Sequence, residues 1–179
     1  MILPQLADLY YHRDFDGVVS AALLLALTPQ KPDLHPVNYD ISSQWSSMKF
    51  RRPTGVVDFL FHPDALLWID HHVDPFLLPE WKTMAEGNQN YIWDTNAPSC
   101  PQLIQQHFDI PEVVHRHFAD YVSWSSIIDS AMFVSAAQAT DLTNPFILLS
   151  KVLSLPISGN FPNLVVEKVL QNSVDMVLS

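Results

Sequence analysis

Short apolar segments of strand length alternate with helix-like segments along the first half of the 179-residue chain. Residues 6–11, 56–61 and 65–69 are apolar on both faces of an extended chain. Residues 17–27, in contrast, are rich in Ala and Leu and suit a helix. Strands that are apolar on both faces are typical of parallel sheets covered by helices on both sides. The sequence therefore predicts an α/β fold with a mainly parallel sheet flanked by helices.

The second half of the chain is predicted to be helical. Residues 98–108 and 111–133 each carry a proline in their first turn, where helices tolerate it. The tail, residues 146–179, is apolar, and the sequence reveals no partner for it. We expect one domain over residues 1–145, and a helical tail that leads towards a second domain or packs in a homodimer.

Composition excludes several classes of function. The chain has only four glycines, no two of them close together, whereas a P-loop and a dinucleotide-binding fingerprint both need clustered glycines. The formal net charge of −10 argues against a long nucleic acid as partner, because that binding needs a basic stripe. A single cysteine and the lack of an apolar run long enough to span a bilayer predict a cytoplasmic protein with no membrane contact.

Acidic and imidazole side chains gather near the ends of three predicted strands. They form three groups in chain order: His12, Asp14 and Asp16; Asp58; and Asp70, His71 and His72. Residues two apart in an extended chain point the same way, so the first group can project from one face. The carboxyl ends of parallel strands meet along one edge, where such folds bind ligands. We therefore expect the three groups to converge.

Converging carboxylates are unfavourable without cations, because neighbouring like charges repel one another. A mixture of imidazole nitrogen and carboxylate oxygen suits Mn²⁺, Fe²⁺, Co²⁺ or Zn²⁺ better than Ca²⁺, and Mg²⁺ stays open. About six ligands suit a two-metal site, in which the ions activate water and hold both oxygens of an in-line displacement at phosphorus. The residues thus point to hydrolysis of a phosphate ester or phosphoanhydride.

One more ligand is expected from the helical half, where Asp120 and Asp129 compete. On an unbroken helix, Asp129 falls within about 20° of Val122 on the apolar stripe, whereas Asp120 lies opposite Asp129. A carboxylate on a buried stripe is unfavourable unless it is paired or bound to metal. We therefore expect Asp129 to be the ligand, with a structural cap or turn as its alternative role.

These motifs resemble those of the DHH-type phosphoesterases. The family's first motif matches residues 12–17 (HRDFDG), its second Val57-Asp58, its naming motif Asp70-His71-His72, and a weaker fourth residues 128–131 (IDSA). The family includes manganese-dependent inorganic pyrophosphatases, exopolyphosphatases, oligoribonucleases, a single-strand exonuclease and cyclic-dinucleotide phosphodiesterases. The resemblance covers roughly residues 6–135 and follows the family's order.

The resemblance implies a Rossmann-like DHH domain that binds two Mn²⁺ ions per chain, with Mg²⁺, Co²⁺ or Zn²⁺ as substitutes. One ion would be held by His12, Asp14 and Asp58, and the other by Asp16, Asp58, His71 and Asp129, so that Asp58 bridges them. His72 would donate to a phosphoryl oxygen or act as general acid, Arg13 would contact phosphate, and Asp70 would orient an imidazole. The catalytic residues expected on this basis are His72, Asp58 and Arg13.

The chain departs from the family pattern after Asn144. Most members carry a second domain with a Gly-rich motif bearing His and Arg, and no such motif follows here. We expect a phosphoesterase acting on a small phosphodiester, a short oligonucleotide or a phosphoanhydride. The alternatives are a non-catalytic metal-holding or regulatory module that has lost turnover with its second domain, and a one-metal zinc hydrolase.

Overall fold

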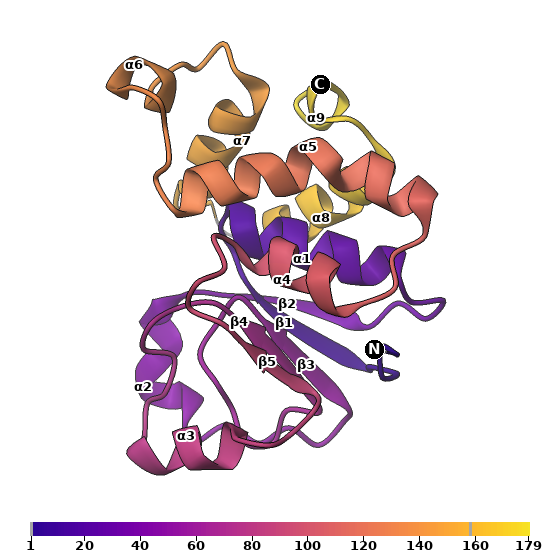
Figure 1. Ribbon diagram of the computed structural model, residues 1–179, viewed down its shortest axis with the longest axis vertical. Coiled ribbons are helices and arrows are strands. Elements are labelled where there is room, and N and C mark those ends of the chain that lie inside the picture. The colour runs from indigo at the N-terminus through magenta and orange to yellow at the C-terminus, as the bar shows by residue number, and fades with distance from the viewer. Residues whose placement is uncertain (1, 158) are drawn as a thin grey trace.

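A five-stranded sheet forms the centre of the computed structural model, which describes residues 2–157 and 159–179 (Figure 1). The strands are β1 (Asp8–His12), β2 (Asp33–Val37), β3 (Thr54–Val57), β4 (Leu67–Asp70) and β5 (Tyr91–Trp93). Their order is β2-β1-β3-β4-β5, and every neighbouring pair is parallel. The predicted parallel α/β fold is confirmed.

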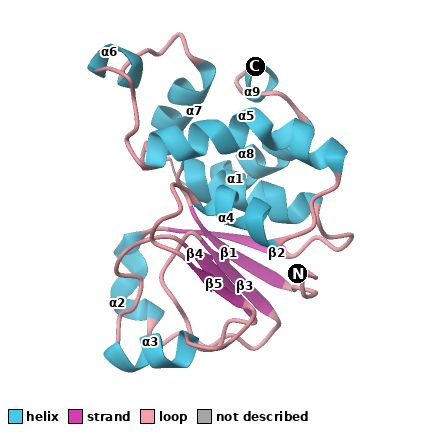
Figure 2. Ribbon diagram, viewed as in Figure 1, coloured by secondary structure: helices cyan, strands magenta, loops and turns pink. Residues whose placement is uncertain are grey.

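Helices cover both faces of this sheet (Figure 2). The sheet separates the apolar core into two clusters, one on each face. On one face lie α1 (Phe15–Ala26), α4 (Cys100–His107) and α5 (Glu112–Asp129), together with the tail helices. Every residue of α1 from 15 to 25 is buried, because this helix lies between the sheet and the outer helices. Strands and helices on this face therefore share one apolar core, as predicted from strands that are apolar on both faces.

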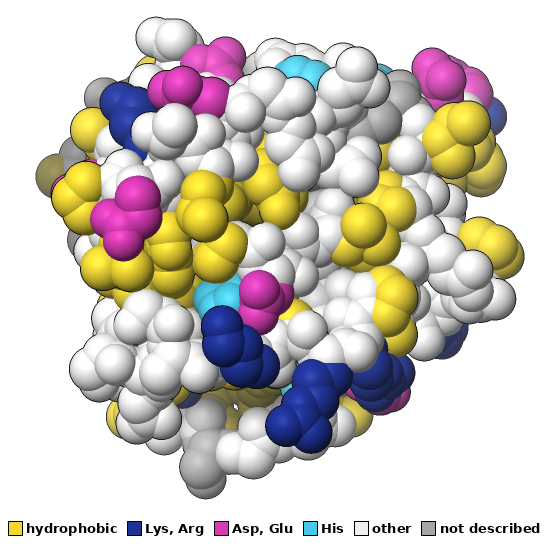
Figure 3. Space-filling view, turned by 90° about the horizontal axis from the view of Figure 1, so that it is seen from below, with side chains coloured by type: hydrophobic (Ala, Val, Ile, Leu, Met, Phe, Trp, Pro, Cys, Tyr) yellow, Lys and Arg dark blue, Asp and Glu magenta, His cyan; other side chains and the backbone are white. Residues whose placement is uncertain are grey.

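The opposite face is covered by short elements and aromatic side chains. These elements are η1 (Tyr39–Ile41), α2 (Ser42–Trp45) and α3 (Pro79–Ala85). Beneath them the rings of Trp45, Phe59, Phe61, Trp68 and Trp81 pack mostly edge to face. Seen from this side, apolar side chains gather in patches beside separate groups of Lys and Arg (Figure 3).

The tail packs on the helical face. It consists of α7 (Pro145–Leu153), α8 (Phe161–Gln171) and α9 (Val174–Val177), which follow the short α6 (Ala136–Ala139). Val165, Val166 and Val169 of α8 are buried in the same core cluster as α1. Tyr11 of β1 donates a 2.7 Å hydrogen bond to Asn163, whose amide donates to the carbonyl of Leu34. The tail thus has a partner within the chain, which the sequence did not reveal; its expected role as a linker or dimer contact stays a prediction.

Two elements end four residues earlier than predicted. The apolar run 56–61 is a strand only as far as Val57, because Asp58 adopts a left-handed backbone with φ of 55°. The helix predicted over residues 111–133 ends at Asp129, because Ala131 has φ of 54° and reverses the chain. In the part of the chain that the structure describes, no helix is both long and apolar enough to cross a membrane.

Candidate metal centre

The candidate site lies at the carboxyl ends of three adjacent strands. His12 is the last residue of β1, Asp58 directly follows β3, and Asp70 is the last residue of β4, with His71 and His72 after it. The chain runs from β1 to β2 on one side and then returns to β3 on the other side of β1. Such a reversal of strand order opens a crevice at the carboxyl edge. The convergence predicted from the sequence is therefore present.

The first turn of α1 brings two more carboxylates to this edge. Asp14 caps the helix by accepting a 3.0 Å hydrogen bond from the backbone N–H of Gly17. Asp16 is buried, and its Oδ2 accepts a 2.8 Å hydrogen bond from the backbone N–H of Cys100, where α4 begins. The helix can begin this close to β1 because Gly17 has no side chain: a Cβ would lie 2.0 Å from the carbonyl oxygen of His12.

One group of potential ligand atoms surrounds the ring of His12. Its Nδ1 lies 3.0 Å from Oδ2 of Asp14 and 3.8 Å from Oδ2 of Asp58. Its Nε2 lies 3.3 Å from Oδ1 of Asn38, which also accepts from the backbone N–H of Tyr39. This oxygen only accepts, so Nε2 carries the proton of the neutral ring. Nδ1 then directs a lone pair at two carboxylates.

A second group of potential ligand atoms surrounds the ring of His71. Its Nε2 lies 3.2 Å from Asp129, 3.5 Å from Asp16 and 3.6 Å from Asp58, in each case to a carboxylate oxygen. Its Nδ1 lies 3.1 Å from the carbonyl oxygen of Ala97. A carbonyl cannot donate, so in the neutral ring Nδ1 carries the proton and the Nε2 lone pair points at three carboxylates.

Asp129 reaches this group because α5 ends directly after it. Two backbone hydrogen bonds close the helix, from Met132 N–H to the carbonyl of Ile127 and from Ala131 N–H to the carbonyl of Ile128. This pairing is the Schellman motif, which ends helices at a residue with left-handed backbone. Asp120, the competing candidate, is exposed on α5 and is not among the residues near His71.

Several ligand atoms in both groups lack hydrogen-bond partners among the described residues. Among the described residues, the buried atoms without a partner include both oxygens of Asp58, Oδ1 of Asp16, Nδ1 of His12 and Nε2 of His71. Opposed lone pairs repel, and an unpaired buried charge costs several kcal/mol. Divalent cations would remove this cost, because imidazole nitrogen and carboxylate oxygen are their ordinary ligands.

Three groups of potential ligand atoms each lie within 4.8 Å of one another. Two sets consist of predicted ligands: one is His12, Asp14 and Asp58, and the other is Asp16, His71 and Asp129. The third group joins Asp58 and His71 to His72. Asp58 lies beside both sets, at 3.8 Å from His12 and 3.6 Å from His71. All six residues predicted as ligands are therefore together, and their arrangement fits a divalent cation in each set. Their binding of metal stays a prediction.

The electrostatics show how unfavourable the metal-free site is. Burial raises the pKa of Asp58 well above its usual range, and the neighbouring carboxylates of Asp16 and Asp14 raise it further. Burial likewise raises the pKa of Asp16 to about 6, and Asp129 adds to the shift. Burial opposes the charged form of His71, but attraction to the nearby carboxylates of Asp129, Asp16 and Asp58 outweighs it, and the pKa of His71 is raised. Without cations, the site therefore retains protons.

Asp58 also carries backbone strain. Its φ of 55° lies in the left-handed region, which costs a residue with a Cβ roughly 1–2 kcal/mol. The conformation is held because its N–H still donates a 2.8 Å hydrogen bond to the carbonyl of Ile69 on β4. Strain of this kind concentrates at functional sites, and here it falls on the residue that adjoins both sets.

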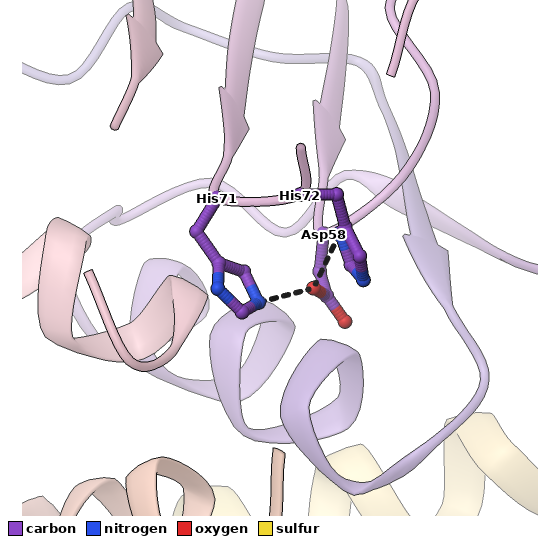
Figure 4. A group of neighbouring side chains, drawn as sticks. All are labelled: Asp58, His71 and His72. Atoms are coloured by element: carbon purple, nitrogen blue, oxygen red, sulfur yellow. Dashed lines mark ion pairs between the residues drawn. The ribbon is translucent and has the colours of Figure 1, made fainter. Parts of the chain in front are cut away.

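His72 lies beside Asp58 (Figure 4), and its shorter contacts are with Asp70 and Trp93. Its Nδ1 lies 2.7 Å from Oδ1 of Asp70 and 3.9 Å from Asp58, and its carbonyl accepts a 2.8 Å hydrogen bond from the indole of Trp93. The hydrogen bond with Asp70 raises the pKa of His72. Asp70 thus orients the imidazole of His72, whereas a backbone carbonyl orients that of His71. The side chain of His72 is 34% exposed, so part of the ring is accessible from solvent.

Arg13 follows His12 but does not point into either set. Its guanidinium donates to the carbonyl of Leu155 in the tail, and its backbone N–H donates to the carbonyl of Val37. No carboxylate in residues 2–157 or 159–179 lies within ion-pair distance of it. Its expected contact with phosphate stays a prediction.

Three groups that orient the site lie at positions the sequence did not single out. Asn38 directly follows β2 at the same edge of the sheet. This position after a strand is the same kind of sequence signal as that of Asp58 after β3. The other two are the carbonyl of Ala97 and the N–H of Cys100. Backbone groups have no residue-type signature, so no sequence pattern could have identified them.

The raised pKa values predict that metal binding releases protons. In the metal-free fold, Asp16 keeps its proton up to a pH of about 6, whereas in the unfolded chain it ionises near 3.8. The folded state thus binds more protons over this range, and the contribution of Asp16 to folding weakens as the pH rises. A cation displaces these protons, so its affinity should increase as the pH rises.

We expect Mn²⁺ binding at pH 6 to release about one proton or more, measured by titration calorimetry in buffers of different ionisation enthalpy. The affinity should fall on acidification from neutral pH to about pH 5. Binding that is independent of both buffer and pH would contradict a site made of these residues.

No protein-family model matches the sequence, and no curated protein matches it. Among solved structures, the chain is similar to the pGpG-specific phosphodiesterase PggH from Vibrio cholerae, with a TM-score of 0.72, 21% identity, and coverage of 96% of this chain and 55% of that one. An uncharacterized protein from Helicobacter pylori G27 gives a TM-score of 0.45 at 12% identity, covering 93% of this chain and 58% of that one. The chain thus spans a little over half the length of these solved structures, and it shares its fold with PggH.

Proposed function

We propose that this chain is a metal-dependent phosphoesterase of the DHH type, which hydrolyses a small phosphodiester, a short oligonucleotide or a phosphoanhydride. The observation that carries the proposal is the buried Asp58 carboxylate, which lies between two sets of ligand atoms with no hydrogen-bond partner among the described residues. The shared fold supports it, because PggH is described as a phosphodiesterase that acts on pGpG.

In this proposal, Mn²⁺ occupies both sets, with Mg²⁺, Co²⁺ or Zn²⁺ as substitutes. Bound divalent cations would lower the pKa of a water nucleophile and polarise the phosphoryl oxygens. The chain's own contribution is to hold six ligand atoms in place and to exclude water from Asp58, which is fully buried. His72 then supplies a proton to the leaving oxygen, and its hydrogen bond with Asp70 favours the protonated ring by raising its pKa.

The decisive experiment is hydrolysis of bis-p-nitrophenyl phosphate by the metal-stripped chain, before and after addition of Mn²⁺. We expect no turnover without metal, and turnover that saturates at two equivalents of Mn²⁺. Anomalous scattering from crystals soaked in Mn²⁺ should then give two peaks on either side of Asp58. Metal binding with no turnover on a panel of phosphate esters and anhydrides would instead indicate a regulatory module. Metal analysis that finds a single zinc ion per chain would indicate a one-metal hydrolase.

The role of His72 can be separated from metal binding. We expect His72→Gln to lower kcat about 10²-fold, because a general acid contributes that much or more. Mn²⁺ stoichiometry should be unchanged, since Nδ1 of His72 lies 2.7 Å from Asp70 and farther, at 3.9 Å, from Asp58. His115→Gln is the matched control, because His115 is exposed on α5. Loss of a metal ion in His72→Gln would make this residue a ligand and not an acid.

A further inference from the structure

Trp93 ends β5 at the same carboxyl edge of the sheet as the candidate metal centre. β5 pairs in parallel with β4, and the register places Trp93 opposite Asp70. The indole of Trp93 reaches the segment that follows β4 and donates a 2.8 Å hydrogen bond to the carbonyl of His72. Two residues that face each other across the β4–β5 pair therefore both contact His72.

These two contacts hold different parts of His72. Nδ1 of the ring lies 2.7 Å from Oδ1 of Asp70, whereas Trp93 binds the backbone. β4 ends at Asp70, so the backbone of His72 lies beyond the residues that the strand fixes. A contact to the ring alone would let the ring move with this backbone. The indole supplies the second point of attachment that a strand no longer provides.

The ring of Trp93 is itself held in place by two neighbours. It lies edge to face with Phe76, with ring centroids 5.1 Å apart and an interplanar angle of 85°. The ammonium group of Lys82 on α3 lies 5.5 Å from the centroid of the indole ring. The side chain of Trp93 is partly buried between them. The indole N–H is therefore a preorganised donor, already aimed at the carbonyl of His72.

We propose that Trp93 is a positioning residue for His72, whose backbone it fixes so that the ring presents Nε2 to the leaving oxygen. With Nδ1 directed at Asp70, Nε2 is the ring nitrogen left to face a substrate. A general acid acts only within hydrogen-bond reach of the oxygen that it protonates, and a displacement of about 1 Å can lower a rate by about 10²-fold. This inference rests on the proposed function, in which His72 supplies that proton.

Two substitutions separate the N–H of Trp93 from its bulk. Trp93→Phe keeps an aromatic ring and loses the N–H, whereas Trp93→His keeps an N–H at the corresponding position of a smaller ring. We expect Trp93→Phe to lower kcat for bis-p-nitrophenyl phosphate about tenfold, with KM and Mn²⁺ stoichiometry unchanged. Trp93→His should retain most of the wild-type kcat. A packing role predicts the reverse order, because phenylalanine fills more of the space than histidine does.

Trp124→Phe is the matched control, because Trp124 is also partly buried but stacks on Phe146 in the helical layer. It should leave kcat unchanged. A double-mutant cycle provides a second test: in a His72→Gln background, Trp93→Phe should cause no further loss of kcat, because its effect passes through His72.

A spectroscopic measurement on the metal-free chain does not depend on turnover. The rings of His72 and Tyr39 lie edge to face, with centroids 6.5 Å apart, so NMR should detect nuclear Overhauser effects between their protons. We expect these signals to weaken in Trp93→Phe, because the His72 ring then samples other orientations. They should persist in Trp93→His and in Trp124→Phe.

The proposal is overturned if Trp93→Phe and Trp93→His have equal kcat values, because the N–H would then be irrelevant. A further loss of kcat in the His72→Gln background, or full ring-to-ring signals in Trp93→Phe, would also overturn it. Absence of turnover by the wild-type chain would instead refute the proposed function. The NMR comparison alone would then decide whether Trp93 holds the ring of His72.

Discussion

Asp58→Asn is expected to lower phosphoesterase activity by at least about 10³-fold, because it removes the carboxylate that adjoins both sets of ligands. The two side chains have nearly the same shape, so packing should be preserved. The amide that replaces the carboxylate is a weak metal ligand, and we expect the variant to retain at most one Mn²⁺ ion. Steady-state kinetics and metal analysis on the same preparation would measure both effects.

The same substitution should have the opposite effect on the stability of the metal-free chain. Burial and neighbouring carboxylates raise the pKa of Asp58, which means that the ionised group disfavours the fold. A neutral amide removes that repulsion, so the free energy of unfolding without metal should rise above the wild-type value at pH 7. Urea denaturation in the presence of EDTA would measure it.

Asp120→Asn is the control for both measurements, because Asp120 is exposed on α5 and lies outside both sets. It should change neither activity nor stability by a measurable amount. If Asp58→Asn keeps wild-type turnover, the proposed two-metal chemistry is wrong. If it lowers activity but also unfolds the metal-free chain, Asp58 acts through the fold.

Gly17→Ala should cost about 3 kcal/mol of stability, a large effect for one methyl group. The added Cβ would lie 2.0 Å from the carbonyl oxygen and 2.7 Å from the carbonyl carbon of His12. These are backbone atoms of a central strand and cannot rotate away, so α1 must shift. The same shift displaces Asp14 and Asp16, and Mn²⁺ affinity should fall with stability.

Gly87→Ala provides the comparison. Gly87 has φ of 80°, and a Cβ there would meet no atom within 4 Å. Its substitution tests backbone strain alone and should cost about 1 kcal/mol. Urea denaturation of both variants without metal would separate the two causes. Equal costs would show that contact with His12 does not limit position 17.

The candidate site was largely predictable because its side chains follow regular elements. The two-residue spacing from His12 to Asp16 and the strand-end positions of Asp58 and His71 were enough to predict convergence. Helical periodicity also favoured Asp129 over Asp120, although the helix was expected to continue to residue 133. The Schellman ending was not visible in advance because Ala131, and not glycine, adopts the left-handed conformation there.

What the sequence could not supply depends on contacts between distant segments. The apolar spacing of Val165, Val166 and Val169 is typical of an amphipathic helix but does not say which surface it covers. The hydrogen bond between Tyr11 and Asn163 joins residues 152 positions apart, and no local pattern announces it. The early end of β3 was not predictable for a different reason: an apolar run shows burial but not the backbone turn at Asp58.

The docking of α8 on α1 has a practical consequence for recombinant expression. A protein truncated after residue 145, where the sequence suggested a domain boundary, would leave the outer flank of α1 facing water. Asp14 caps that helix and Asp16 lies in its first turn, so its loosening would reach the edge of the sheet where the candidate ligands lie. We expect such a truncation to aggregate, as light scattering would reveal, whereas the 179-residue form remains monodisperse.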